Sequence, residues 1–194
     1  MPSVTRIVHK PGVVPSLVAA LLAAWIAGTS AARPDSDYRY KAAFVYGVIK
    51  FVEWPASALP AGSQPIRLAV LGEDALSAFE AAFAGKTAAG HPIEVRGYAR
   101  AKDLGPCEVL FIAQEAAQQA RDALLSIRGR AVLTVSEPLA PGTPPTIIRL
   151  DVVNTKLVFD ASLQTARDSG LKLSSNLLRL ARTVDGDGPA TPAP

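Results

Sequence analysis

Hydrophobic residues recur with two different spacings along this chain, and each spacing predicts a type of element. Short, continuous apolar runs predict buried strands over 66–71, 108–112 and 131–135, and an alternating run predicts a shorter strand over 93–96. Apolar residues three and four positions apart predict helices over 38–52, 73–84, 115–128, 162–169 and 175–183. The first of these helices is apolar around most of its circumference, so we expect it to be mostly buried.

Two further strands near the C-terminal end predict a hairpin. They cover 147–153 and 156–160, and Asn154-Thr155 joins them, although Asn-Thr is a weaker turn signal than Asn-Gly. Strands that alternate with helices and are almost wholly apolar favour a parallel sheet covered on both faces. The sequence therefore predicts an α/β fold: a mostly parallel sheet flanked by helices, with an antiparallel hairpin near the C-terminus, in one domain over residues 33–183.

The two ends of the chain have their own patterns. Arg6 and Lys10 precede an apolar run over 13–28, and small residues end this run, as in a secretory signal peptide over residues 1–32 that is cut after Ala31 or Ala32. The apolar run of about 16 residues is shorter than the roughly 20 that a spanning helix needs, which favours cleavage over retention as a membrane anchor. At the other end, the Pro- and Gly-containing residues 184–194 predict a disordered tail.

Charge argues against a nucleic-acid-binding protein. The whole chain of 194 residues carries 20 basic and 17 acidic residues, a net charge of +3. Without residues 1–32, 18 basic and all 17 acidic residues remain, so the net charge falls to +1. Acidic and basic residues are interspersed along the rest of the chain, whereas a nucleic-acid-binding domain normally shows a basic stripe.

Residue types that carry catalysis are scarce. Beyond residue 32, His91 is the sole histidine and lies in a polar loop that we expect to be solvated, and Cys107 is the chain's sole cysteine. One His and one Cys do not make an ordinary zinc site, and neither a nucleophile-elbow motif nor a phosphate-binding loop is present. We therefore expect no enzyme activity, no catalytic residue, no metal and no cofactor, with Cys107 unpaired and half-buried at the start of a strand.

The most unusual local segment is Lys-Phe-Val-Glu-Trp-Pro at 50–55. A charged pair three residues apart is usually a modest surface ion pair, and a Trp before a Pro usually packs the end of a helix onto the core. The functional alternative is an aromatic and charged patch where a partner or a small ligand binds, because Trp is enriched at such sites. On that interpretation the contact residues are Tyr46, Lys50, Glu53 and Trp54.

Two other groups of polar residues are candidates with simpler explanations. Ser174 and Ser175 precede the last predicted helix, where one of them is expected to cap it, and they are also candidates for partner or ligand contact. Glu53, Asp151 and Asp160 would form a carboxylate pair only if the fold brought two of them together, and their spacing does not indicate that it does.

Four segments of the chain resemble the YfiR-like proteins of Gram-negative bacteria, which are secreted periplasmic regulators. These segments are 41–55, 68–72, 107–112 followed by 133–136, and 171–181, and they occur in the family's order. The first and the last are specific as a pair, and together the four extend over nearly the whole predicted domain.

The resemblance implies an α/β domain with a parallel sheet and an antiparallel hairpin. It also implies a non-enzymatic role, because the best-known members bind the periplasmic sensory domain of an inner-membrane diguanylate cyclase and hold it inactive. This lowers cyclic di-GMP and restrains biofilm formation; an outer-membrane lipoprotein can sequester the regulator, and a homodimer agrees with the family. The alternative is a periplasmic solute-binding component of a transport or sensory system, with its ligand at the carboxyl ends of the parallel strands near Gly72 and Ser136.

The chain departs from the family's pattern at three places. Ala69 stands where members often have a Cys that can pair with the one at the position of Cys107, so that bridge cannot form here. Pro144 and Pro145 stand where a Gly-Gly pair often precedes the hairpin, and Ser162 stands where an Asn is usual after its second strand.

A single cysteine predicts a protein whose stability does not respond to a reducing agent. The purified protein should show the same melting temperature with and without reductant, because one Cys cannot close a bridge within its own chain. Thermal unfolding followed by circular dichroism tests this. A large drop on reduction would show an intermolecular disulfide instead.

Overall fold

The computed structural model describes residues 34–60, 62 and 64–185, which belong to one structural unit. The export signal predicted over residues 1–32 lies outside the described residues, as do residues 186–194 of the predicted tail. Val184 and Asp185, which that prediction placed in the tail, belong to the last strand of the sheet. Within the described part of the chain, no helix has the length and apolar character needed to cross a membrane.

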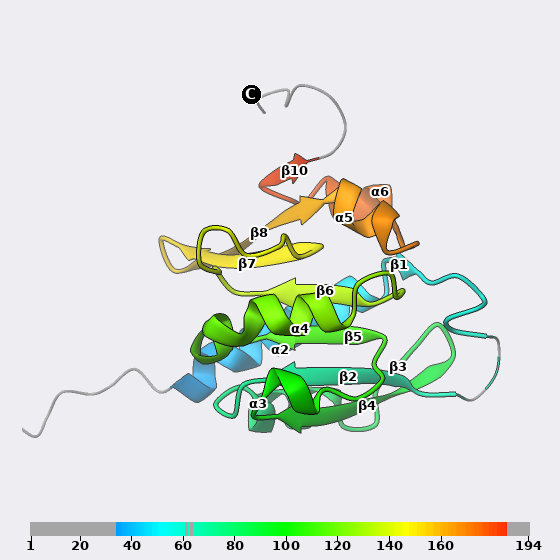
Figure 1. Ribbon diagram of the computed structural model, residues 1–194, viewed down its shortest axis with the longest axis horizontal. Helices are drawn as coiled ribbons and strands as arrows, with labels where there is room; N and C mark the ends of the chain where they lie inside the picture. Colours follow the sequence, from blue (N-terminus) through cyan, green and yellow to red (C-terminus); the bar gives the residue numbers. More distant parts are fainter. Residues whose placement is uncertain (1–33, 61, 63, 186–194) are drawn as a thin grey trace, which may run out of the picture. The chain divides into compact units, whose positions relative to one another are not determined.

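An eight-stranded sheet forms the centre of the unit, in the order β10-β8-β7-β6-β5-β2-β4-β3 (Figure 1). Five neighbouring strands, β4, β2, β5, β6 and β7, are parallel, whereas β8 is antiparallel to β7, and β3 to β4. The strands of this sheet are β2 (Ile66–Leu71), β3 (Thr87–Ala88), β4 (His91–Tyr98), β5 (Val109–Ile112), β6 (Leu133–Ser136), β7 (Ile148–Val153), β8 (Lys156–Ser162) and β10 (Thr183–Asp185). The predicted α/β class and the C-terminal hairpin are confirmed.

Helices cover both faces of the sheet, with α2 behind it and α4 in front of it in Figure 1. They are α2 (Pro34–Ile49), α3 (Leu76–Phe83), α4 (Ala120–Ser126), α5 (Leu163–Asp168) and α6 (Ser175–Leu178), with short 3-10 helices η2 (Ala101–Asp103) and η3 (Gln114–Gln119). Along β2, Leu68 and Val70 face the core under α2 and α3, while Ala69 and Leu71 face the core under η3 and α4. Burial on both faces explains why the central strands are apolar almost without interruption.

The start of α2 is tied to the carboxyl ends of β5 and β6 by buried charges. The ammonium of Lys41 donates to Asp37 Oδ2 at 2.8 Å and to Glu137 Oε1 at 2.7 Å, and Lys41 and Glu137 are both buried. Burial lowers the pKa of Lys41, but the hydrogen bonds to the two carboxylates outweigh it, so the pKa lies above its usual value. One turn earlier, the hydroxyl of Tyr38 donates to Glu115 Oε2 at 2.8 Å.

The helix predicted over 38–52 is wrong at its C-terminal end and in its burial. It ends at Ile49, and Val52–Glu53 form strand β1, which pairs antiparallel with β9 (Lys172–Leu173). The backbone at this point therefore bonds to a segment that is distant in sequence, which local periodicity cannot reveal. The helix is also less buried than expected, since Tyr40 is 73% exposed.

Two other predicted helices are shorter than the sequence pattern indicates. The segment 115–128 divides into η3 and α4. The helix predicted over 175–183 ends at Leu178, because the N–H of Arg182 donates to the carbonyl of Phe159 at 2.7 Å and directs the chain into β10 beside β8. The short strands β1, β3, β9 and β10 were not predicted, since their pairing is set by tertiary contacts.

His91 is buried rather than solvated. It begins β4, is 6% exposed, and its Nδ1 lies 2.8 Å from the carbonyl oxygen of Gln64. The polar loop predicted a solvated side chain here. The turn between β3 and β4 instead places the imidazole ring against the backbone at Gln64.

Removing the charge of Lys41 should destabilise the protein strongly. Lys41→Met leaves Glu137 buried without its cation, so we expect the free energy of unfolding to fall by about 3 kcal/mol. Urea unfolding measures this. The double variant Lys41→Met/Glu137→Leu should recover most of the loss, because both charges are then gone. Equal instability of the two variants would contradict a buried ion pair as the cause.

Candidate functional site

An apolar groove lies between α2, the strand β8 and the segment that includes α6. It encloses about 450 Å³, and its lining residues are apolar apart from Gly47 and Arg182. The floor is formed where the ring of Phe44 packs on that of Phe159, with centroids 5.0 Å apart. On its rim, Phe51 is 39% exposed and Leu180 is 72% exposed. Large exposed apolar side chains that gather around a hollow are typical of a contact surface for another molecule.

Gly47 belongs to the α2 wall of this groove. A Cβ built on Gly47 would have nothing within 4 Å, and the residue does not have a positive φ. Glycine inside a helix costs roughly 1 kcal/mol relative to alanine. The described part of the chain therefore contains no steric or conformational reason for a glycine at this position.

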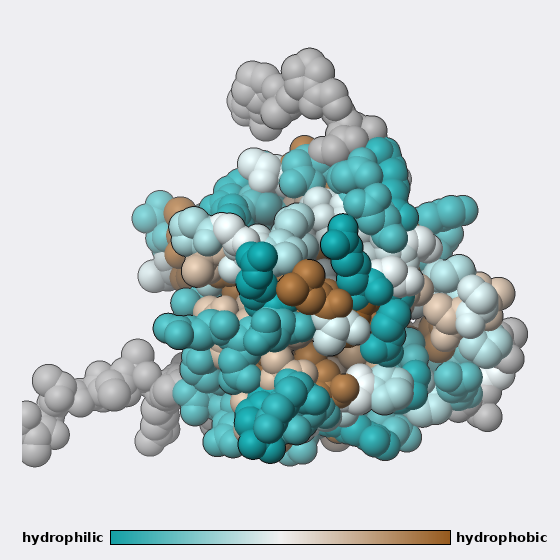
Figure 2. All heavy atoms as spheres, viewed as in Figure 1, coloured by the Kyte–Doolittle hydropathy of each residue, from teal (hydrophilic) through white to brown (hydrophobic). Residues whose placement is uncertain are grey.

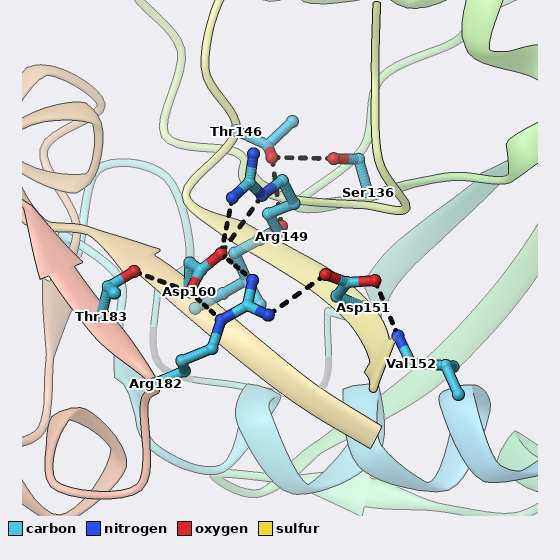
Figure 3. Close-up of polar contacts among 9 residues, drawn as sticks. Ser136, Thr146, Arg149, Asp151, Val152, Asp160, Arg182 and Thr183 are labelled. Carbon is cyan, nitrogen blue, oxygen red and sulfur yellow. Dashed lines mark hydrogen bonds and ion pairs between the residues drawn. The ribbon is translucent and has the colours of Figure 1, made fainter. Parts of the chain in front are cut away.

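A cluster of charges stands beside the groove on the hairpin (Figure 3). Arg149 Nη2 donates to Asp160 Oδ2 at 2.7 Å, and Arg182 Nη2 donates to the same oxygen at 2.6 Å. Arg182 Nη1 also reaches Asp151 Oδ2 at 3.1 Å, so this arginine bridges the two carboxylates. Thr183 Oγ1 donates to Asp160 Oδ1 at 2.6 Å. The fold thus brings Asp151 and Asp160 to one arginine rather than to each other, while Glu53 lies in β1.

The arginines hold the Asp160 carboxyl in its charged form. The hydrogen bond from Arg182 lowers the pKa of Asp160 well below its usual range, and the bonds from Thr183 and Arg149 add to this against the opposing effect of burial. The carboxylates likewise raise the pKa of Arg182. These contacts hold Arg182 where it lines one end of the groove.

Of the predicted contact residues, Tyr46 lies on α2 toward α3 and Lys50 directly follows the end of α2, and both contact their own chain. The Tyr46 hydroxyl donates to the carbonyl of Thr87 at 3.1 Å, and its ring stands edge-on to that of Phe83. The ammonium of Lys50 lies 5.2 Å from the centroid of the Tyr46 ring. These contacts within the chain give both side chains a structural role. Their role in binding a partner stays a prediction.

The small sheet of β1 and β9 brings together the other four predicted residues. Glu53 pairs with Lys172 in this sheet, and the N–H of Ser174 donates to the carbonyl of Phe51 at 2.9 Å. Ser174 is the N-cap of α6, as predicted, whereas Ser175 is the exposed first residue of that helix. Trp54 is half-buried against the core, and its Nε1–H is buried without an acceptor in the described residues. Glu53, Trp54 and the serines therefore lie at the end of α2 beyond Phe51.

The crevice expected at the carboxyl ends of β2 and β5 is filled at Gly72. The carboxylate of Glu115 occupies it, accepting from the N–H of Asp74 at 3.1 Å and from the hydroxyl of Tyr38. A Cβ on Gly72 would lie 2.4 Å from Glu115 Oε1, and the φ of +122° also requires glycine. The position that commonly binds ligands in doubly wound sheets is thus closed by the protein's own side chains.

The other half of the expected crevice, at Ser136, borders a polar hollow of about 440 Å³ under the Pro-containing loop before β7. The hydroxyls of Ser136 and Thr146 are 2.9 Å apart, and Thr146 donates to the carbonyl of Ile148 at 3.1 Å. Arg149 and Asp160 of the charge cluster form another part of its wall. The cluster therefore separates this hollow from the apolar groove.

Cys107 is a free thiol that is buried, not half-buried as predicted, and it lies two residues before β5 rather than at the start of that strand. Burial raises its pKa to about 11, so it is protonated at neutral pH and unsuited to act as a nucleophile. Ala69, which stands where relatives often have a second Cys, packs in the same core. Among the residues that the structure describes, no group of three His, Cys, Asp or Glu side chains is placed to hold a metal ion.

The face over α4 differs from the groove. Figure 2 shows that hydrophilic side chains cover most of it and that hydrophobic atoms appear there in small, separate areas. Leu125 of α4 is 47% exposed there and borders a hollow of about 450 Å³, which Leu124, Ile127 and Val132 also line.

The sequence pattern did not reveal the groove residues Phe44 and Phe51, because it assigned both to the buried circumference of a helix. One signal was available: Gly47 interrupts an otherwise apolar helix, and an isolated helical glycine often has a packing or functional reason. Leu180 lies beyond the end of α6, and no pattern marked it.

A doubly wound α/β domain that presents an open apolar groove beside a charge cluster has the features of a protein-binding domain. The model of the YfiR/HmsC-like family matches residues 38–182, so the chain belongs to this family. Its proteins are regulatory rather than catalytic and act in signalling through protein partners. No curated protein matches the chain.

Neutralising Asp160 should weaken the protein in a pH-dependent way. Asp160→Asn removes the charged acceptor of two arginines, and we expect the free energy of unfolding near neutral pH to fall by about 2 kcal/mol. Because the folded pKa of Asp160 lies below its unfolded value near 4, the wild-type advantage is complete above about pH 5 and is lost as the pH falls through the folded pKa.

Urea unfolding at about pH 7, 5 and 3 measures this difference. Glu94→Gln is the control, since Glu94 is exposed and 3.8 Å from Arg96, so its loss should change little at any pH. A difference between wild type and Asp160→Asn that stays constant down to the lowest pH would refute the assignment to this carboxylate.

Proposed function

We propose that this protein is a periplasmic regulator that binds the periplasmic sensory domain of an inner-membrane diguanylate cyclase, or of a related membrane sensor, and holds it inactive. Cyclic di-GMP and biofilm formation are then lowered. The observation that carries the proposal is the open apolar groove between α2 and β8, in a chain that belongs to a family of signalling regulators. The export pattern of residues 1–32 supports the periplasmic location.

The proposed mechanism is a shift in population rather than a chemical step. A regulator that binds the inactive conformation of a sensor more tightly than the active one lowers the population of the active conformation. A difference of a few kcal/mol between the two affinities is enough to move a balanced equilibrium almost completely. Sequestration of the regulator by an outer-membrane lipoprotein would return the sensor to its active state.

A periplasmic solute-binding component is the second candidate. The observation that favours it is the polar hollow beside Ser136, at the carboxyl end of β6. The filled crevice at Gly72 weighs against it, because half of the expected binding position is closed by Glu115.

Deletion of the gene separates the two candidates. A repressor of a cyclase predicts higher cyclic di-GMP and stronger surface attachment in the deletion strain, both restored by the plasmid-borne gene. Mass spectrometry of nucleotide extracts and a crystal-violet attachment assay measure them. A deletion strain with unchanged cyclic di-GMP and attachment would refute the repressor.

Two matched variants test whether the groove makes the contact. Leu180→Ser removes a 72% exposed apolar side chain from the rim, and Leu125→Ser removes the same side chain, 47% exposed, from α4. We expect Leu180→Ser to fold normally but to fail to lower cyclic di-GMP in the deletion strain, and Leu125→Ser to act like wild type. Equal activity of both variants would place the contact elsewhere.

A further inference from the structure

We propose that the hollow between α4 and α5 binds a small amphiphilic anion, a carboxylate with an apolar body, and that Arg128 and Arg130 hold its carboxylate. This hollow shares no lining residue with the apolar groove. The inference goes beyond the proposed function, since it concerns a small ligand rather than the partner. Three observations support it: the apolar walls of the hollow, two arginines without carboxylate partners, and a buried hydroxyl with a proton to donate.

Three parts of the chain form the walls of the hollow. The end of α4, the helix in front of the sheet in Figure 1, forms one wall together with the turn that follows it; the end of α5 and the loop before β7 form the other two. The volume of about 450 Å³ lies within the range of small-molecule pockets, roughly 300–1,000 Å³. Apolar residues from α4 to β6 line it, among them Leu124, Ile127 and Val132.

Two consecutive prolines make the third wall stiff. Pro144 and Pro145 line the hollow from the loop before β7, and their rings fix the backbone φ. A wall that is already fixed loses little conformational freedom when a ligand binds against it. The hollow is therefore suited to a small apolar body without rearrangement of this loop.

Two cations of the lining have no carboxylate partner in the part of the chain that the structure describes. Arg128 and Arg130 are both exposed, and neither guanidinium has an ion pair or a hydrogen bond there. The remaining charged residue of the lining is Asp168, whose carboxylate accepts from Gln164 Nε2 at 2.8 Å. The planar guanidinium matches the geometry of a carboxylate. Two arginines and one aspartate leave one net positive charge, which favours a singly charged anion over a doubly charged one.

A buried hydroxyl of the lining also has a proton to donate. Thr134 of β6 is 5% exposed, and its Oγ1 accepts from the N–H of Ile147 at 2.8 Å. Its own proton has no acceptor among the described residues. A buried donor without an acceptor costs free energy, and an oxygen atom of a bound ligand would remove that cost.

Three probes test this chemistry on the full chain. Octanoate carries both the apolar body and the anion, octanamide replaces the anion with a neutral amide, and acetate keeps the anion without the body. Titrations of isotope-labelled protein followed by NMR measure the affinity and locate the site. We expect octanoate to bind at least about tenfold more tightly than either other probe, to shift the amide signals of residues 128–130, and to bind more weakly as salt rises.

Two matched double variants separate this site from general attraction of anions to the surface. Arg128→Gln/Arg130→Gln should weaken octanoate at least about tenfold and leave the melting temperature unchanged, because both side chains are exposed and unpaired. Arg39→Gln/Arg96→Gln removes the same charge from exposed arginines outside the hollow and should leave octanoate binding unchanged.

Several results would overturn the inference. Equal binding of octanoate and octanamide does so, as does equal weakening by the two double variants, since these arginines then do not hold the anion. Absence of octanoate binding also overturns it; if phosphatidylglycerol vesicles then sediment the protein, a lipid headgroup rather than a free carboxylate is the anion. A deletion strain with unchanged cyclic di-GMP refutes the proposed function and leaves this inference standing.

Discussion

The structure depends on the ammonium of Lys41, which ties α2 to the sheet from within the protein. A lysine that is 5% exposed is stable only with carboxylates at hydrogen-bond distance, and Asp37 and Glu137 provide them. This contact and that of Tyr38 to Glu115 tie the first turns of α2 to the carboxyl ends of β5 and β6. Glu115, which anchors Tyr38, also fills the crevice at Gly72, so one carboxylate both holds the helix and closes the usual ligand position.

Because α2 is anchored at its start, its opposite end is free to border the groove, which is the proposed contact surface. Val45 and Val48 pack inward, while Phe44, Gly47 and Phe51 turn toward β8 and border the groove. The hairpin completes this surface with apolar residues on the side of α2 and the charge cluster on the other. Arg149 of the hairpin and Arg182, which precedes β10, both donate to Asp160, so the charge of this carboxylate is balanced on the hairpin.

The elements that the sequence predicted well are those whose cause is local. The strand over 66–71 has five buried apolar residues among its six, as a central strand requires. The hairpin turn at Asn154 and Thr155 has positive φ at both residues, as its tight connection requires. The elements it missed are those made by distant partners. Val52 lies in a strand instead of the helix because it pairs with Leu173. The last helix ends early because the N–H of Arg182 donates to the carbonyl of Phe159.

For the candidate site, too, some features follow from the sequence and others only from tertiary contacts. The apolar pattern in this sequence was sufficient to indicate the α/β class, because burial on both faces of a parallel sheet imposes a continuous apolar pattern on the strands. The family came from the four segments in the family's order, and a role in regulation was what that resemblance implied. Which apolar residues remain exposed was decided by the tertiary structure alone. Phe51 and Leu180 are as hydrophobic as any core residue, and only the packing of α2 on the hairpin determines that their side chains face outward beside an open groove.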